Sequence, residues 1–176
     1  TDVIEIDALI EDTENWTPHA ENKAGKPTFT GGKLTLNATS AYQTACYTGK
    51  AYTNKTFRFT YQQSGSGWGG FYFNKSDPVA MPWADKGVLV VIKPYQVELQ
   101  RYGDEGGILK TVTGEIFRSD MIYDVSFGIV DVNSTDVRIF VTVDGKTLFD
   151  ETITDATLHG ASGYFGAIAP AGGVRV

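Results

Sequence analysis

Amides, one carboxylate and flat aromatic rings recur at every second position of short apolar runs in this sequence. Glu98, Gln100 and Tyr102 alternate with apolar side chains in residues 97–102, and Tyr72 and Asn74 do so in residues 70–74. A sugar ring has apolar C–H faces and hydroxyl groups at its edge, which suit a flat aromatic ring and hydrogen-bonding side chains, respectively. The pattern therefore predicts a sheet face that binds sugar.

Eight side chains form the candidate ligand-binding set. The aromatic platforms are Trp68, Tyr72, Trp83 and Tyr102, and the residues that could read hydroxyl groups are Gln62, Asn74, Glu98 and Gln100. Trp83 belongs to the longest irregular stretch, residues 75–86, which favours a wall beside the polar face. The alternative for both tryptophans is a structural role, with Trp68 plugging the core and Trp83 capping its edge.

Other chemistries are less well supported by the residue spacing. Residues 65–70 (GSGWGG) match a dinucleotide fingerprint formally, but a strand rather than a helix is expected to follow them. Cys46 is the only cysteine, so it can form no intramolecular disulfide, and we expect it to be buried. His19 and His159 have no metal-binding spacing and are expected in loops or at the surface.

Acidic residues were considered as catalysts and as metal ligands. Retaining glycoside hydrolysis needs two facing carboxylates about 5 Å apart, whereas Glu98 has only Gln100 at the next position on its face. Oxygen ligands suit calcium, although no spaced ligand loop is visible. The carboxylates that could help to hold a structural calcium are Asp12, Glu14, Asp131, Asp136 and Asp155. No other cofactor is expected.

Period-two alternation and frequent glycine turns predict an all-β fold, a sandwich of two antiparallel sheets packed face to face. No stretch keeps helical spacing over three turns. An immunoglobulin-like sandwich is the alternative, but it is usually shorter and lacks support from a Cys-Trp-Cys pattern. The expected strands are residues 3–10, 33–38, 42–47, 55–63, 69–75, 87–93, 96–102, 107–113, 123–130, 136–143, 146–153 and 163–169.

Composition limits the partners. We expect one domain over residues 1–176, and an aromatic share of 12% argues against disorder. The net charge of −6 argues against nucleic acid and anionic membranes, and no apolar run reaches the length of a membrane span. Five Asn-X-Ser/Thr triplets are either glycan acceptors or features of a Thr-rich bacterial surface, and both readings suit a secreted or cell-surface protein. They begin at Asn15, Asn37, Asn54, Asn74 and Asn133.

Several segments together resemble the concanavalin A-like lectin/glucanase superfamily, particularly its laminin-G-like and levan-binding-type modules. The resembling segments are residues 9–12 with Trp16, residues 87–102, residues 137–148 and residues 163–168. The resemblance implies that the fold is an all-β, two-sheet antiparallel jelly-roll sandwich with curved sheets. It also implies a ligand on the concave face or on loops at its rim, and a calcium ion in many members. In such modules a final strand commonly follows the last segment, which makes residues 174–176 the expected start of a strand that the sequence cuts short. Binding positions vary within the superfamily, so the resemblance identifies no individual site residue in this sequence.

We therefore expect a non-catalytic carbohydrate-binding module that binds a polysaccharide or oligosaccharide, as a monomeric unit tethered within a larger chain. The alternatives are a glycoside-active enzyme that uses Glu98 and a structural or adhesive spacer. Alternation further predicts that Tyr72, Gln100 and Tyr102 face the ligand, so that their removal weakens binding with little loss of stability. Phe73 should instead lie in the core.

Overall fold

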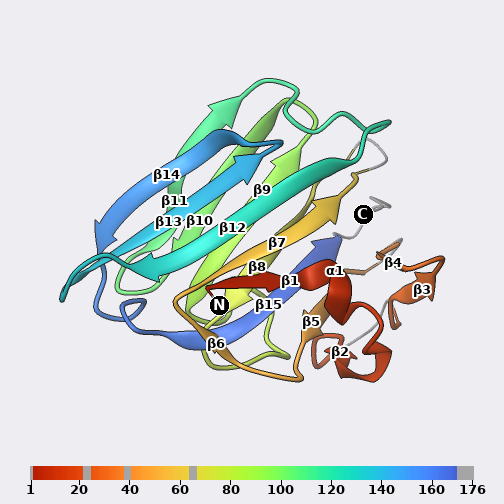
Figure 1. Ribbon diagram of the computed structural model, residues 1–176, viewed down its shortest axis with the longest axis horizontal. Helices are drawn as coiled ribbons and strands as arrows, with labels where there is room; N and C mark the ends of the chain where they lie inside the picture. Colours follow the sequence, from red (N-terminus) through yellow and green to blue (C-terminus); the bar gives the residue numbers. More distant parts are fainter. Residues whose placement is uncertain (1, 22–24, 38–40, 64–66, 170–176) are drawn as a thin grey trace.

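The computed structural model describes residues 2–21, 25–37, 41–63 and 67–169, and nearly all regular structure within these ranges is β (Figure 1). Two sheets pack face to face, which confirms the predicted jelly-roll sandwich. No helix in the described ranges is long and apolar enough to span a membrane.

The first sheet has five strands in the order β1-β7-β12-β13-β14. Its members are β1 (Val3–Glu5), β7 (Lys55–Tyr61), β12 (Tyr123–Asp131), β13 (Asp136–Val143) and β14 (Lys146–Thr154). All neighbours are antiparallel except β1 and β7. The β13–β14 turn has positive φ at both Asp144 and Gly145, as the Asp-Gly hairpin signature predicts.

The second sheet has eight strands, in the order β11-β10-β9-β8-β15-β5-β2, with β6 also paired to β15. Its members are β2 (Trp16–Thr17), β5 (Gln43–Tyr47), β6 (Tyr52–Thr53), β8 (Gly69–Asn74), β9 (Gly87–Lys93), β10 (Gln96–Tyr102), β11 (Gly106–Thr113) and β15 (Ser162–Ala169). A separate hairpin of β3 (Thr28–Thr30) and β4 (Lys33–Thr35) lies at one end.

The main core fills the space between the two sheets, and the predicted alternation is confirmed there. Phe59 of the first sheet meets Phe71 of the second with ring centroids 4.9 Å apart. Phe73, Val97 and Leu99 are buried in the same cluster. Because side chains alternate along a strand, the residues between them must face the opposite side of the eight-stranded sheet.

The strand expected over residues 3–10 is wrong beyond Glu5. The chain instead turns into a short helix, α1 (Ile6–Leu9), followed by a 3₁₀ turn, η1 (Thr13–Asn15). Ile6, Leu9 and Ile10 follow helical spacing, so one turn of helix brings all three to the core. The Trp16 indole N–H donates to the Leu9 carbonyl at 2.9 Å and holds the turn in place.

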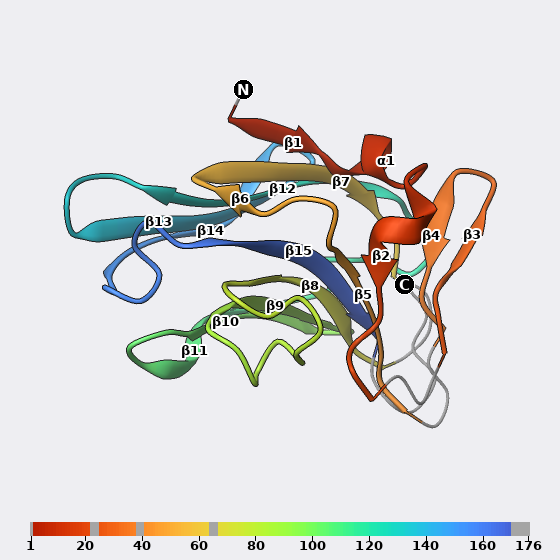
Figure 2. The same cartoon turned by 90° about the horizontal axis from the view of Figure 1, so that it is seen from below.

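The connection between β8 and β9, residues 75–86, extends from the eight-stranded sheet on the side away from the five-stranded sheet (Figure 2). We call these residues the β8–β9 loop. Its backbone is joined at its base, where the Lys75 N–H donates to the Lys86 carbonyl at 2.7 Å. The loop therefore lies on the outer face of the sheet that carries most of the candidate residues.

Candidate functional site

The outer face of the eight-stranded sheet brings together most of the candidate residues. Strand register places Tyr72 of β8 beside Leu89 of β9, and Leu89 beside Gln100 of β10. These three residues form one row across the three strands. A second hydrophobic cluster covers this face. It consists of buried Cys46, Tyr72, Leu89, Val91 and Ile168, with partly buried Tyr42, Trp68, Met81, Tyr102 and Tyr164 packed against them.

Polar side chains form a continuous hydrogen-bonded row along the outer face of β10. The Glu98 carboxylate lies 2.5 Å from the Lys93 ammonium and accepts hydrogen bonds from Gln96 at 2.7 Å and Gln100 at 3.1 Å. The Tyr102 hydroxyl in turn donates to Gln100 Oε1 at 2.5 Å. We call these five residues the polar row. Each side chain holds its neighbour in place, so the row presents amide, ammonium and phenol groups in a fixed geometry.

Glu98 is the only carboxylate in this row, and it is ionised at neutral pH. Burial alone would raise the pKa of its carboxyl, but the hydrogen bonds from Lys93, Gln100 and Gln96 outweigh burial and leave the pKa below its ordinary value. Its cross-strand neighbours are Val91 on β9 and Thr111 on β11. The outer face around Glu98 on these described strands therefore offers no second carboxylate for a two-carboxylate hydrolysis.

Three aromatic rings gather at the end of the sheet where β8 begins. The Tyr42 ring lies with its centroid 6.1 Å from that of Trp68 and 5.1 Å from that of Trp83. We call Tyr42, Trp68 and Trp83 the aromatic rim. Trp83 is 39% exposed and the other two are half-buried, so the group is accessible from solvent. Neither tryptophan belongs to the main core, in contrast to the structural roles considered for them.

The aromatic rim adjoins the polar row. Gly69 pairs with Ile92, which brings the preceding Trp68 beside Lys93. Tyr42 was not among the predicted site residues. Its position could have been found, because alternation through β5 places Tyr42 on the same side of the strand as Thr44 and Cys46.

Tyr72 and Asn74 lie on the predicted face, but neither side chain is accessible to solvent in this structure. Both are 0% exposed, since Tyr72 is enclosed in the apolar cluster with Leu89 and Ile168, and Asn74 is bonded to the β8–β9 loop. Met81 of the loop packs against the cluster around Tyr72. The Asn74 amide donates to the carbonyls of Asp77 at 3.1 Å and Ala80 at 2.9 Å. Burial also means that Tyr72 contributes to stability.

Gln62 lies away from the other candidates. It follows β7, which belongs to the five-stranded sheet, and its amide donates to the Ser119 carbonyl at 3.3 Å. It lines a cavity of about 380 Å³ together with Asp7, Lys33 and Ile122. Its assignment to the same ligand surface as Glu98 and Gln100 is therefore wrong.

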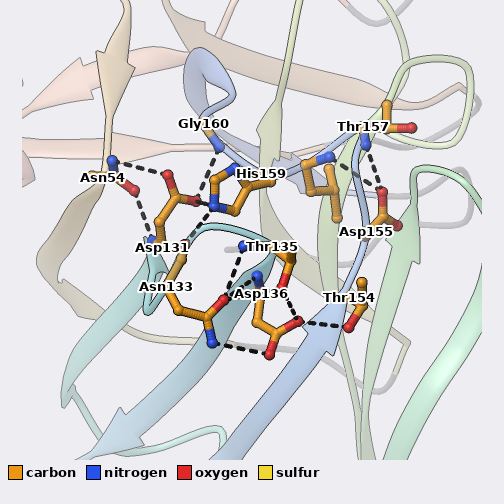
Figure 3. Close-up of polar contacts among 11 residues, drawn as sticks. Asn54, Asp131, Asn133, Thr135, Asp136, Thr154, Asp155, Thr157, His159 and Gly160 are labelled. Atoms are coloured by element: carbon orange, nitrogen blue, oxygen red, sulfur yellow. Dashed lines mark hydrogen bonds and ion pairs between the residues drawn. The ribbon is translucent and has the colours of Figure 1, made fainter.

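The five carboxylates considered for calcium do not converge. Figure 3 shows three of them, each held by its own hydrogen bonds. Asp131 accepts from the Gly160 N–H at 2.9 Å, Asp136 accepts from Thr154 at 2.6 Å, and Asp155 accepts from the Thr157 N–H at 3.0 Å. Asp12 is engaged elsewhere by Tyr47 at 2.7 Å. Within the described residues, no group of three acidic, histidine or cysteine side chains could hold a metal.

Four further predictions concern Cys46, His19, the glycine-rich segment and the C-terminal residues. Cys46 is buried as expected, whereas His19 lies in a loop but is buried against Thr44, with 3.0 Å between Nδ1 and the hydroxyl oxygen. β8 begins at Gly69, so a strand does follow the glycine-rich segment, although residues 64–66 lie outside the described ranges. The strand expected after residue 173 also lies outside them.

No protein-family model matches the sequence, and no curated protein is significantly similar to it. Solved structures do match. One is the carbohydrate-binding module CBM66 from Bacillus subtilis, at TM-score 0.66 and 14% identity over 92% of this chain and 91% of the other. Another is the Emp46p carbohydrate recognition domain in its potassium-bound form, at TM-score 0.66 and 10% identity over 95% and 87%.

A glycoside hydrolase shares the same architecture. The Bacteroides ovatus mixed-linkage glucan GH16 protein, in complex with a G4G4G3G product, matches at TM-score 0.63 and 12% identity over 91% of this chain and 82% of the other. The protein therefore has the concanavalin A-like lectin/glucanase fold. Because binding modules, lectin domains and hydrolases all share it, the fold does not by itself select one of these functions.

Proposed function

We propose that this protein is a non-catalytic carbohydrate-binding module whose ligand lies across the aromatic rim and the exposed part of the polar row. Strand register supports this most directly, because extending the Gly69–Ile92 pair by one residue places Trp68 next to Lys93. Stacking surface and hydrogen-bonding groups are thus available to one sugar chain. Carbohydrate-binding neighbours with the same fold are consistent with the proposal.

The size of the contact predicts weak binding. Covering half of a large aromatic ring removes roughly 75–125 Å² from water, which contributes about 2–3 kcal/mol at ~25 cal/mol per Å². Two such platforms, less the cost of immobilising the ligand, give an affinity between about millimolar and micromolar. Affinity in this range is useful when a module is tethered to other domains, which is the setting we propose for a secreted or cell-surface protein.

Electrostatics favour a neutral glycan. The chain carries a net charge of −6, and the Lys93 ammonium on the proposed surface is neutralised by Glu98. A uronate or sulfate group placed here would meet the ionised Glu98 carboxylate with no unpaired cation in the polar row to compensate for it. Neutral hydroxyl groups, in contrast, can form hydrogen bonds with the partly exposed side chains of Gln96, Gln100 and Tyr102.

Hydrolysis is the competing function, because a GH16 enzyme is among the structural neighbours. Affinity electrophoresis and reducing-sugar release on one panel of neutral polysaccharides, including mixed-linkage β-glucan, separate the two functions. The module proposal predicts retardation on at least one polysaccharide without release of reducing ends. Turnover that disappears in Glu98→Gln would show instead that this is an enzyme, and an absence of retardation throughout the panel would favour the spacer.

A further inference from the structure

The β8–β9 loop carries its own internal framework. The Asp85 carboxylate accepts hydrogen bonds from the Ser76 N–H and the Asp77 N–H, each at 2.9 Å, and from the Ser76 hydroxyl at 2.8 Å. The Lys75–Lys86 backbone bond closes the loop at its base. These bonds lie within the loop, so it can move about its base as one unit without breaking them.

Fewer interactions fasten the far part of the loop to the rest of the described chain. The Ala20 N–H donates to the Val79 carbonyl at 2.9 Å, and the Asn74 amide bonds to the carbonyls of Asp77 and Ala80. Met81 and Trp83 make the apolar contacts, with the outer cluster and with Tyr42 respectively. Backbone pairing of the loop with the sheet is confined to its base.

Two buried polar atoms on the outer face of β8 have no hydrogen-bond partner among the described residues. They are the Tyr72 hydroxyl oxygen and Asn74 Oδ1, on residues two apart in β8 that share the outer face. The Tyr72 hydroxyl lies over Gly166 of β15 and is close enough to the Thr44 hydroxyl and the Cys46 thiol to interact with both, although neither is placed for an ordinary hydrogen bond. Both Asn74 N–H groups point to loop carbonyls, which leaves its oxygen as the atom without a partner. Each buried polar group without a partner calls for an explanation, such as an ordered water or a functional role.

We propose that the β8–β9 loop is a lid and that the surface beneath it, around Tyr72 and Asn74, is a second sugar subsite. This inference rests on the proposed carbohydrate binding and extends it. When the lid opens, Asn74 offers an amide oxygen and two freed N–H groups, which fit two adjacent sugar hydroxyls. Tyr72 offers one hydroxyl that can donate and accept, and Leu89 and Ile168 offer apolar contacts for the C–H groups of the ring.

Because the lid carries Trp83, the aromatic rim and the covered subsite act together. A sugar chain that stacks on Trp83 while the lid is open would be bound by both the lid and the sheet. Opening is unfavourable without ligand, since it exposes the apolar cluster around Tyr72 to water. The ligand therefore has to bind the open form more tightly than the closed form in order to populate it.

The decisive variant is Tyr72→Phe, which removes only the hydroxyl and is expected to fold. A glycan array of neutral oligosaccharides, followed by calorimetric titration of the strongest wild-type hit, supplies the probe. The expected result is a roughly tenfold loss of affinity, equivalent to about 1.4 kcal/mol, with a melting temperature equal to or above that of the wild type. The matched control is Tyr61→Phe, because the Tyr61 hydroxyl is buried but donates to Gln63 at 2.8 Å. That control should lower the melting temperature without changing affinity.

Unchanged affinity in Tyr72→Phe, while the wild type binds and the Trp83→Ala variant is weakened, would overturn the lid and leave the proposed function intact. A wild type that binds nothing on the array would overturn both. A second variant replaces residues 76–85 with Asn-Gly, so that Lys75 and Lys86 form the last pair of a two-residue hairpin. Because this shortened variant also lacks Trp83, its matched control is Trp83→Ala. The shortened variant should bind the same probe with a faster association rate than Trp83→Ala, and an equal or slower rate would contradict the proposal that the loop is a lid.

Discussion

The rings of Tyr42 and Trp83 meet with centroids 5.1 Å apart and planes at 67°, although one precedes β5 and the other lies in the β8–β9 loop. This edge-to-face contact joins the loop to the segment that leads into β5. It also completes the aromatic rim, with Trp68 on the other side of Tyr42. The same loop therefore covers Tyr72 and presents Trp83 to solvent.

Replacing Trp83 by alanine should weaken glycan binding by more than tenfold while lowering stability little. Its ring is 39% exposed, so a sizeable part of its surface is available to a ligand. Calorimetric titration with the strongest array hit measures the change. Phe140→Ala is the control, since Phe140 lies on the outer face of the five-stranded sheet under Arg138. An equal loss in both variants would contradict a local effect.

Phe73→Ala should destabilise the protein by about 3–5 kcal/mol through cavity formation in the main core. Tyr72→Ala should also destabilise it, by about 2–5 kcal/mol, because that ring is completely buried in the outer apolar cluster. Denaturant unfolding with a fluorescence readout measures both. A Tyr72→Ala variant as stable as the wild type would show that Tyr72 is not packed in this cluster in solution.

Asp155→Asn should be among the most damaging single-atom changes, at about 3–5 kcal/mol. The carboxylate is 0% exposed, lies 3.3 Å from Arg101 Nη1 and accepts backbone N–H groups of Asp104 and Thr157. An amide would leave the guanidinium without its buried partner and turn one acceptor into a donor.

The matched control for that change is Asp150→Asn. Asp150 pairs with Arg138 at 2.8 Å, but both side chains are 42% exposed, so water replaces the lost contact. We expect a loss of less than about 1 kcal/mol. Denaturant unfolding of the two variants in the same buffer makes the comparison, and similar losses in both would be inconsistent with a buried anchor at Asp155.

Glu98→Gln should reduce stability at neutral pH and reduce it less in acid. The folded-state pKa of Glu98 lies below its ordinary value of 4.5, so the ionised carboxylate stabilises the fold above about that pH. This contribution is lost as the pH falls through the folded-state pKa. Urea unfolding near pH 7 and near pH 3 should therefore show a gap between the wild type and Glu98→Gln that narrows in acid. A gap independent of pH would mean that Lys93 and the two glutamines do not hold the carboxylate ionised.

Alternation in the sequence predicted most strands and the face of each side chain, because one buried face imposes a strict period of two. It correctly separated Phe73 from Tyr72 and Leu99 from Glu98. Alternation cannot tell which of two sheets a strand joins, and Gln62 was therefore grouped with residues of the other sheet.

The covered state of Tyr72 also lay beyond the sequence. The alternation of residues along a strand predicts which face of the sheet a side chain lies on, but not which segment covers that face. The β8–β9 loop has no periodic pattern from which its path could be inferred. Its attachment depends on Asn74 and Ala20, which bond to loop carbonyls that any residue type could supply. The sequence does contain the signal for Tyr42, because residues 42, 44 and 46 alternate and therefore share one side of the chain at β5.

We propose above all that the outer face of the eight-stranded sheet binds a neutral glycan through the aromatic rim. The most direct measurement is a neutral-glycan array probed with the wild type and with a variant in which Tyr42, Trp68 and Trp83 are all alanine, after circular dichroism has confirmed that both are folded. The account predicts binding of the wild type to at least one glycan family and loss of that signal in the variant. Equal signals from the two proteins, or no signal from the wild type, would contradict it.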